Sequence, residues 1–363
     1  MVVLPVDDLH DAWPSKFHNN ALRLGALLHP ASMNSRLEST LSQLQGLHGS
    51  HFQLSALFGP QHGYDGSTQD NMIEWQGHRD PRLGIPIHSL YGDHRQPTPE
   101  MLADLDVLFV DLVDVGSRYY TFIWTLLLCL KAADAQQLPV IVCDRPNPIN
   151  GVTVEGEPQD SDYLSFVGLH QVPIRHARTI GELARQFQQE LFPSIELTVL
   201  PIKGWQRSMW YDDTGLPWVL PSPNMPTLDT AIVYPGMCLL EGTNLSEGRG
   251  TTRPFEIFGA PWIDPYRLVA QLNEKALPGV VFRPMSFEPT FQKHARQLCH
   301  GAQIHVQDRE ALRPVELGLE ILRCVQITWP TEFGWNPPPY EYEYEKQPIE
   351  ILLGGPVERF GLD

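Results

Sequence analysis

The sequence predicts an α/β protein with a Rossmann-like domain built on a parallel sheet and a second, smaller α/β domain at the C-terminus. Short, almost wholly apolar runs alternate with helix-like segments through the first half of the chain. The chain has 363 residues, and single hydrophobic cores stop growing near about 250–300 residues. A second alternation of helix and strand patterns begins near residue 264. We therefore predict domains at 1–262 and 263–363.

The expected elements follow from these apolar patterns. Thr179 and Glu182 have the spacing of a capping box, which predicts the start of a helix at Thr179. The stretch 221–252 shows no core pattern and is expected to be a long ordered loop. The tail at 337–345, rich in Pro, Tyr and Glu, is expected to run over the surface. Strands are predicted at 22–28, 52–58, 107–110, 140–143, 197–201 and 303–306, and further helices at 37–47, 119–136, 266–275 and 315–326.

The net charge and the cysteine content limit the expected binding partners and the expected cellular compartment. The formal net charge is −17 and no Lys/Arg cluster offsets it, so neither nucleic acid nor an anionic membrane surface is an expected partner. The five cysteines are odd in number and form no CxxC pair, which predicts reduced core thiols rather than disulfides or a zinc site. No signal-peptide pattern and no bilayer-length apolar run is present. We expect a cytoplasmic protein, although a trimmed exported form stays open.

Three predicted strands end in polar, conformationally restricted loops at 59–66, 111–120 and 144–148. Ligands of parallel α/β sheets bind beyond the carboxyl ends of the strands. Each loop alone can be a structural turn, but three together favour a binding site. We expect these loops and the loop at 241–252 to line one cleft.

Several common catalytic motifs are absent from the sequence. There is no GxGxxG, no P-loop, no HExxH and no GxSxG. No cofactor and no metal site is therefore predicted. The segment 248–252, Gly-Arg-Gly-Thr-Thr, is either a tight turn or a backbone nest in which an Arg binds an anion.

Carboxylates and aromatic side chains are abundant in the same loops. Glycoside hydrolysis uses two carboxyl groups that flank the scissile bond, and aromatic rings can pack on sugars. Each carboxylate taken alone can equally be a helix cap or a group that holds a loop. The carboxylates are Asp111, Asp114, Asp144, Glu241, Glu247 and Glu256, and the aromatic residues are Tyr119, Tyr120, Trp124 and Tyr234.

Five motifs occur in one order along the chain and together resemble those of the exo-β-N-acetylmuramidase family of NamZ type, long catalogued as a domain of unknown function. The resemblance runs from about Leu22 to Leu353. The motifs are SLYG at 89–92, DLVDVGSRYYT at 111–121, DRPNP at 144–148, PSPNMP at 221–226 and EGTNLSEGRGTT at 241–252.

This resemblance implies a glycoside hydrolase that releases N-acetylmuramic acid, or a related amino sugar, from the non-reducing end of peptidoglycan fragments. Such an activity belongs to cell wall recycling. The resemblance also implies a Rossmann-like larger domain, a smaller C-terminal domain and a site in the cleft between them. N-Acetylmuramic acid carries a lactyl carboxylate, which an Arg-bearing loop such as 248–252 can bind.

The chain departs from the family pattern in two places. Characterised members carry Pro-Glu-His-Gly where this chain has Pro60-Gln61-His62-Gly63, and glutamine cannot donate a proton as a carboxylic acid does. Asp65 and Glu74 are nearby substitutes for that acid. The family also continues past Gly354-Gly355 through another helix and strand, so the C-terminal domain is expected to be truncated.

The residue roles that follow from this resemblance are expectations. The alternative to an enzyme is a non-catalytic sugar-binding or sensing protein that lost the acid at position 61. The sequence leaves open the exact glycan, the stereochemical outcome and the oligomeric state. The expected catalytic residues are Gln61, His62, Asp114 and Glu247, and the expected substrate-binding residues are Arg118, Tyr119, Asp144, Arg145, Asn147, Asn224, Glu241, Asn244, Arg249 and Thr251.

Overall fold

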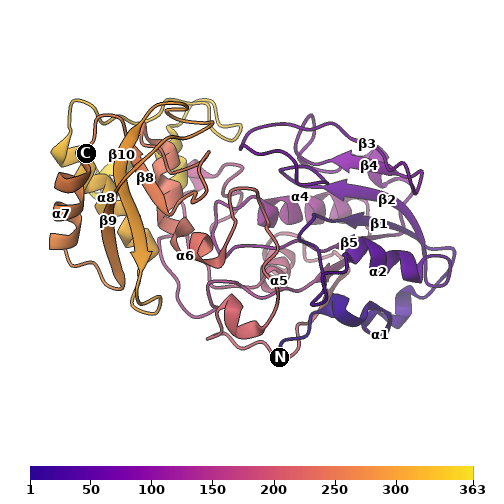
Figure 1. The fold of residues 1–363 in the computed structure, drawn as a ribbon. Coiled ribbons are helices and arrows are strands. Elements are labelled where there is room, and N and C mark those ends of the chain that lie inside the picture. The colour runs from indigo at the N-terminus through magenta and orange to yellow at the C-terminus, as the bar shows by residue number, and fades with distance from the viewer. Residues whose placement is uncertain (363) are drawn as a thin grey trace. The chain divides into compact units, whose positions relative to one another are not determined.

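The structure is a computed structural model that describes residues 1–362. The chain forms two compact units (Figure 1). The first unit comprises residues 1–116, 120–152 and 177–223, and the second comprises residues 117–119, 153–176 and 224–362. The predicted domain assignment, 1–262 and 263–363, stays a prediction. No helix in the described part of the chain is long and apolar enough to cross a membrane.

The first unit is built on a seven-stranded sheet. Only β3 is antiparallel, to β4, and the other strands pair in parallel. If β3 is left out and the six parallel strands are counted from one to six along the chain, their order across the sheet is 3-2-1-4-5-6. This is the Rossmann order. The spatial order is β3 (His78–Arg79), β4 (Pro86–Ser89), β2 (Gln53–Gly59), β1 (Arg23–Leu27), β5 (Val107–Val110), β6 (Val140–Cys143) and β7 (Leu197–Leu200).

The predicted strands of this unit form because their apolar runs are buried. All residues of β5 and β6 are buried, as expected for strands covered on both faces. The core cluster joins this sheet to Leu41, Leu44 and Leu47 of α2. Figure 1 shows α4 and α5 on the other side of the sheet from α1 and α2. The helices are α1 (Leu9–Ala12), α2 (Thr40–Leu47), α3 (Pro99–Leu102), α4 (Phe122–Ala135) and α5 (Ile180–Leu191).

The capping box at the start of α5 is formed as predicted. The Thr179 hydroxyl accepts from the backbone N–H of Glu182 at 3.2 Å, and the Glu182 carboxylate accepts from the backbone N–H of Thr179 at 3.0 Å. Glu182 is therefore held in a helix cap.

The second unit contains an antiparallel sheet with the order β8-β10-β9. Together with the Rossmann order of the first unit, this architecture confirms the predicted fold class. Its strands are β8 (Ile257–Ala260), β9 (Val280–Phe287) and β10 (Cys299–Val306), and its helices are α6 (Leu228–Met237), α7 (Pro265–Glu274), α8 (Pro314–Thr328) and α9 (Pro348–Leu353).

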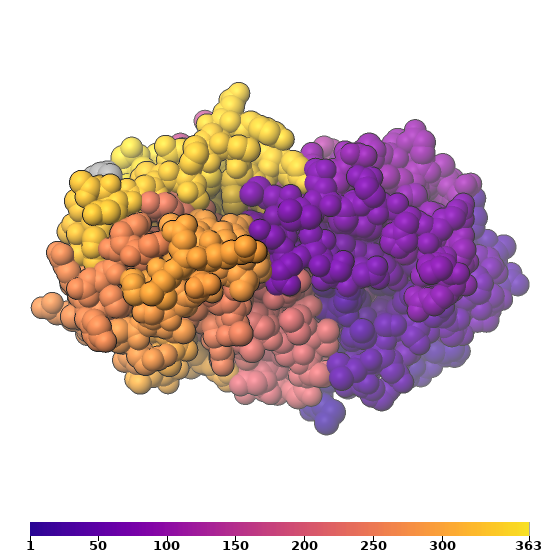
Figure 2. Space-filling view, turned by 45° about the horizontal axis from the view of Figure 1, so that its top comes forward, coloured from indigo at the N-terminus to yellow at the C-terminus, as the bar shows by residue number. Residues whose placement is uncertain are grey.

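Two sequence expectations for the second unit are wrong in detail. The stretch predicted as a loop at 221–252 contains α6, in which Thr227 caps the first turn and Pro235 lies inside the helix. The tail at 337–345 is not only a surface segment. Figure 2 shows residues near the C-terminus, in yellow, on the surface of the molecule, yet Tyr340 and Glu341 are buried.

Candidate functional site

The Rossmann order places a topological switch point between β1 and β5 of the first unit. From β1 the chain proceeds to β2 and β4 on one side, whereas β5 is followed by β6 and β7 on the other. The loops after β1, β2, β5 and β6 emerge at the same sheet edge, where such folds bind ligands. Five candidate residues of these loops are buried in this unit: Gln61, His62, Asp114, Arg145 and Asn147.

Gln61 is buried with its amide held from both ends. Its Oε1 accepts from the Thr121 hydroxyl at 2.5 Å, and its Nε2 donates to the Tyr91 hydroxyl at 3.0 Å. Tyr91 comes from the SLYG motif and Thr121 from the end of the 111–121 motif. Hydroxyl groups both donate and accept, so both neighbours can equally donate to a carboxylate. A glutamate at position 61 can accept from both hydroxyls once the Tyr91 hydroxyl turns its hydrogen toward it.

His62 lies in a tight turn that fixes its ring. Its φ is 71° and that of Gly63 is 87°, and a non-glycine residue in this region is uncommon and often functional. Its Nδ1 lies 3.0 Å from the carbonyl oxygen of Thr68. Because a carbonyl can only accept, Nδ1 carries a proton and the neutral ring has its lone pair on Nε2. In that tautomer Nε2 is the acceptor nitrogen of the His62 ring.

Arg145 forms a buried ion pair with Asp111. Its Nε and Nη2 donate to the two carboxylate oxygens at 2.5 and 2.7 Å, which is the bidentate geometry of an Arg–carboxylate pair. Thr40 donates to the same carboxylate at 2.5 Å, and Nη2 also reaches the carbonyl of Met33 at 2.9 Å. These contacts tie together the loops after β1, β5 and β6. The expected anion-binding role of Arg145 stays a prediction.

The other candidates of this unit are held by backbone groups. Asp114 accepts from the N–H of Gly116 at 2.8 Å. Asp144 accepts from the N–H of Gly181 at 2.8 Å, in the first turn of α5, and burial raises its pKa despite this bond. Asn147 donates to the carbonyl of Arg178 and accepts from the N–H of Ile149. Asp144 and Asn147 therefore hold loops, and their contact with a substrate stays a prediction.

The second unit contains a buried cluster of charged side chains around Arg249. The Nε and Nη2 of Arg249 lie 3.3 and 2.7 Å from one oxygen of Glu241, and Nε lies 3.4 Å from Glu247. The other oxygen of Glu241 accepts from the Tyr340 hydroxyl at 2.5 Å. Glu247 pairs with Lys293 at 2.7 Å. Two carboxylates and two cations thus compensate one another in this cluster.

The protonation states of this cluster follow from its contacts. Burial tends to raise the pKa of Glu241, but the charge of Arg249 and the hydrogen bond from Tyr340 outweigh it and lower that pKa. Burial likewise tends to lower the pKa of Arg249, and the two glutamates raise it. The Nη1 of Arg249 is buried and has no hydrogen-bond partner among residues 1–362. One charged donor of the cluster is therefore unpaired among the described residues.

Arg118 occupies a structural position in the second unit. Its guanidinium is fully buried and donates to the carbonyls of Glu157, Val172 and Leu352. Burial lowers its pKa to about 10. Because the side chain has no exposed surface, we do not include Arg118 among the groups proposed to hold an anion.

The remaining expected residues of this unit differ in how much of their polar surface is occupied. The buried Tyr119 hydroxyl has no hydrogen-bond partner in the described part of the chain, and its ring lies edge-on to that of Tyr234. The Asn244 amide is used by the backbone of Glu332 and Gly334. Thr251 donates to the carbonyl of Gly248. Asn224 is buried.

Sequence reasoning missed four side chains that hold the candidate groups. Tyr91 and Thr121 lie inside motifs that had been singled out, so the motifs themselves were a usable signal. Lys293 and Tyr340 had no such signal, because 46 and 99 residues separate them from the glutamates they contact. The expectation that all candidate loops line one cleft stays a prediction.

Family models match nearly the whole chain. The N-terminal model of exo-beta-N-acetylmuramidase NamZ matches residues 24–229, and the C-terminal model matches residues 232–362. The chain belongs to the NamZ exo-β-N-acetylmuramidase family. The resemblance inferred from the five motifs is thereby confirmed. The family is one of glycosidases.

Individual relatives agree with this assignment. The peptidoglycan beta-N-acetylmuramidase NamZ of Bacillus subtilis (strain 168) is 46% identical over 311 residues, which are 86% of this chain and 74% of that protein. Two solved structures of DUF1343 family proteins from Bacteroides fragilis NCTC 9343 are similar. The first has a TM-score of 0.87 at 32% identity, and the match covers 99% of this chain and 91% of the Bacteroides chain. The second has a TM-score of 0.75 at 26% identity, and the match covers 100% of this chain and 90% of the Bacteroides chain.

Proposed function

We propose that this protein is an exo-acting glycosidase that releases N-acetylmuramic acid from the non-reducing end of peptidoglycan fragments. Membership of the NamZ family and the B. subtilis relative support the reaction class. The structural observation that carries the substrate assignment is the buried Nη1 of Arg249, which has no partner among the described residues. A lactyl carboxylate supplies the acceptor that this donor lacks.

The proposed roles follow from the contacts within each unit. In the first unit, Gln61 and His62 act on the scissile bond, and the Nε2 of His62 exchanges a proton. In the second unit, Arg249 binds the anionic group. Asp114 or Glu247 supplies the carboxylate that stabilises the positively charged transition state of glycoside cleavage. Nitrogen and hydroxyl groups of the loops bind the sugar hydroxyls and the acetamido group.

The substrate class is tested with two nitrophenyl β-glycosides, one of N-acetylmuramic acid and one of N-acetylglucosamine. They differ only in the lactyl ether. A charge-assisted hydrogen bond contributes about 1.5–3 kcal/mol, so we expect kcat/KM for the muramide to be higher by about 10-fold or more. Equal kcat/KM for the two substrates would contradict the proposed recognition of the carboxylate.

Gln61 favours a second candidate function, that of a sugar-binding protein without catalysis. Because the hydroxyls next to Gln61 can donate to a carboxylate, Gln61→Glu is the substitution that tests the missing acid. General acid catalysis contributes about 10²–10⁴-fold. We expect Gln61→Glu to raise turnover of an unactivated muramyl disaccharide while leaving the nitrophenyl glycoside, which needs little protonation, nearly unchanged.

The other outcomes of that experiment separate the candidates. Strong wild-type turnover that Gln61→Glu abolishes identifies Gln61 as part of a different site chemistry. No turnover of either substrate by either protein, together with measurable binding of N-acetylmuramic acid, favours the sugar-binding protein.

We also infer that the protein acts in the cytoplasm on a small carbohydrate rather than on nucleic acid or a membrane. All five cysteines are buried and free, which is typical of a reducing compartment. The charge of −17 disfavours polyanionic partners.

A further inference from the structure

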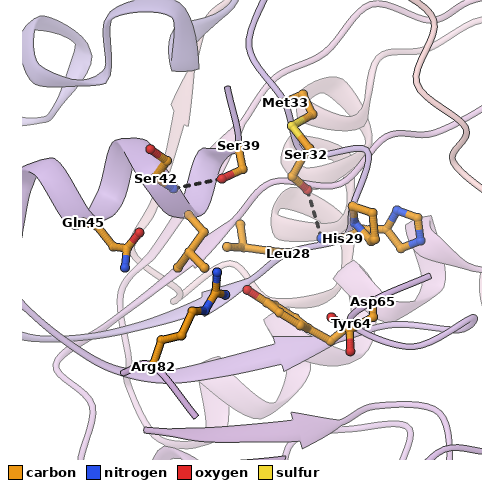
Figure 3. A pocket seen from close by; sticks show the side chains of 12 residues that line it. Leu28, His29, Ser32, Met33, Ser39, Ser42, Gln45, Tyr64, Asp65 and Arg82 are labelled. Carbon is orange, nitrogen blue, oxygen red and sulfur yellow. Dashed lines mark hydrogen bonds between the residues drawn. The ribbon is translucent and has the colours of Figure 1, made fainter. Parts of the chain in front are cut away.

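The second unit contains a pocket of about 270 Å³ at one edge of its antiparallel sheet. Its wall comes from the last residues of β10, from the first half of α6 and from the segment that precedes β8. A pocket of the first unit, lined in part by His29, Tyr64 and Asp65 (Figure 3), lies beside the Gln61–His62 loop and belongs to the candidate site already described. In contrast, none of the groups given a role in the proposed reaction lines the pocket of the second unit.

The edge of β10 is open over its last residues. The pairing of β8 with β10 ends at residue 303 of β10. One further bond joins the N–H of Ile304 to the carbonyl of Glu256 at 2.9 Å. The chain then turns away, because Glu256 donates its own N–H to the carbonyl of Arg253 at 3.3 Å. Val306, two residues further along β10, is therefore left without a strand partner on this side within residues 1–362.

The backbone groups of Val306 point toward this open edge. The N–H of Gln307 donates to the carbonyl of Gly279 at 2.8 Å, so Val306 and Val280 form a non-hydrogen-bonded pair of the β9–β10 ladder. In such a pair, the N–H and C=O of each residue are directed away from the other strand. Neither group of Val306 makes a hydrogen bond in the described part of the chain. One backbone donor and one backbone acceptor are thus available at the pocket that Val306 lines.

Polar side chains with unoccupied groups line the same pocket. The exposed carboxylate of Asp229, on α6, makes no hydrogen bond or ion pair among the described residues. The half-exposed Arg253 uses Nη1 to pair with Glu256 at 3.0 Å, and its Nε and Nη2 bond to no group of residues 1–362. The Nε2 of His305 is buried and has no hydrogen-bond partner in that part of the chain. The lining therefore presents an anion, a cation and an imidazole nitrogen beside the open backbone of Val306.

We propose that this pocket binds a short peptide with free termini, which pairs with Val306 as an added strand. One extended residue of such a peptide presents the N–H and C=O that complete the two backbone groups of Val306. The ammonium group and the carboxylate of the peptide are complementary to Asp229 and Arg253. A neutral sugar lacks this pair of opposite charges. The pocket is slightly smaller than the usual range of about 300–1,000 Å³ for small-molecule sites, so a peptide of about three residues is the expected size.

Titration of the intact chain with tri-alanine tests the site by NMR. The backbone amide signal of Val306 should shift, and its hydrogen exchange should slow, because the N–H becomes bonded. N-Acetyl-tri-alanine amide keeps the backbone groups of the probe but lacks both charges, so we expect it to bind more weakly by about 10-fold or more. An unshifted Val306 amide in the presence of tri-alanine would overturn the proposal, as would equal affinity for the two peptides.

A substitution in the lining and a matched control show where the peptide binds. Asp229→Asn removes the anion at nearly constant size, and we expect the dissociation constant for tri-alanine to rise about 3- to 5-fold. Glu274→Gln removes another exposed carboxylate, at the end of α7 and outside the pocket, and should leave the affinity unchanged. Equal losses in the two variants would reveal unspecific attraction by surface charge and overturn the site.

Two sugars separate this site from the proposed function. N-Acetylmuramic acid and N-acetylglucosamine should leave the Val306 amide signal in place. A shift of that signal by either sugar, at a concentration where tri-alanine has no effect, would assign the pocket to carbohydrate and overturn the peptide site. The measurements require no turnover, so they decide the peptide site even if the protein cleaves no glycoside.

Discussion

At the scale of single residues, the guanidinium groups of Arg118, Arg145 and Arg249 show how burial and partners decide what a charged side chain does. Arg118 is committed to backbone carbonyls, and Arg145 holds Asp111 through Nε and Nη2. Arg249 satisfies two glutamates and still has a buried donor without a partner. For Arg249 we propose that a ligand accepts from this donor.

Arg249→Lys tests this donor while keeping the positive charge between the two glutamates. Lysine is a point charge without the guanidinium fork, so we expect binding of N-acetylmuramic acid to weaken by about 10-fold or more. Binding of N-acetylglucosamine should change less. Titration calorimetry with both sugars measures the difference, and Arg253→Lys, which alters a half-exposed guanidinium paired with Glu256, is the control. Equal losses for the two sugars would argue against a carboxylate contact.

Tyr340→Phe tests the other side of the same cluster. The variant removes the hydroxyl that helps lower the pKa of Glu241, and a hydrogen bond to a charged group contributes about 1.5–3 kcal/mol. A carboxyl with a lowered folded-state pKa stabilises the fold above its unfolded pKa, and this contribution is lost as the pH falls through the folded value. The variant should therefore be less stable at pH 7, and the difference should shrink below pH 4.

Urea unfolding of both proteins between pH 7 and pH 3 measures that difference. A further readout separates a change in ionisation from loss of packing. The acid limb of kcat/KM should move to higher pH in Tyr340→Phe, because Glu241 protonates more easily. A pH-independent loss of stability with an unmoved acid limb would show that Tyr340 contributes only by packing.

At the scale of elements, α6 and α8 approach each other at two glycines. A Cβ on Gly318 would lie 2.3 Å from the carbonyl oxygen of Gly236, and one on Gly236 would lie 1.6 Å from that of Pro314. The backbones are therefore in direct contact, which no larger residue permits. The Pro235-Gly236 pair, which suggested a loop, instead lies in the last turns of α6.

Gly318→Ala should reverse the usual effect of this substitution. In a helix, Gly to Ala normally stabilises by about 0.5–1 kcal/mol. Here the added methyl has to displace α6, and overpacking costs typically about 1–3 kcal/mol. Gly46→Ala in α2 is the matched control, because no atom lies within 4 Å of a Cβ placed there. In thermal unfolding, the Tm of Gly318→Ala should be lower than that of the wild type, and the Tm of Gly46→Ala should be equal or higher. If Gly318→Ala instead raised the Tm, the added methyl would be accommodated by a shift of α6 away from α8 that costs little.

At the scale of the whole molecule, the five thiols are all enclosed by the fold. Each cysteine is buried, and burial raises the pKa of every thiol, that of Cys299 to about 11. The thiolate is the nucleophile in thiol exchange, so a folded molecule should react slowly with Ellman's reagent at pH 8. Unfolding in guanidinium chloride should release all five thiols. Rapid reaction of one or more thiols in the native protein would contradict the buried, protonated state.

The sequence by itself determined the parallel α/β sheet of the first unit and the resemblance to the family. Both depend on local features: uninterrupted apolar runs for the buried strands 107–110 and 140–143, and five motifs in a fixed order. The sequence also placed Gln61 and His62 in one loop at the end of β2. These features are readable because neighbouring residues along the chain produce them.

Only the tertiary structure decided which polar groups are occupied. Tyr340 reaches Glu241 across 99 residues, and Arg145 reaches Asp111 across 34. Helix α6 was hidden because its burial against α8 overrides the helix-breaking tendency of its Pro and Gly. Composition and spacing cannot reveal such partners, since each contact depends on the simultaneous packing of segments that are far apart in the chain.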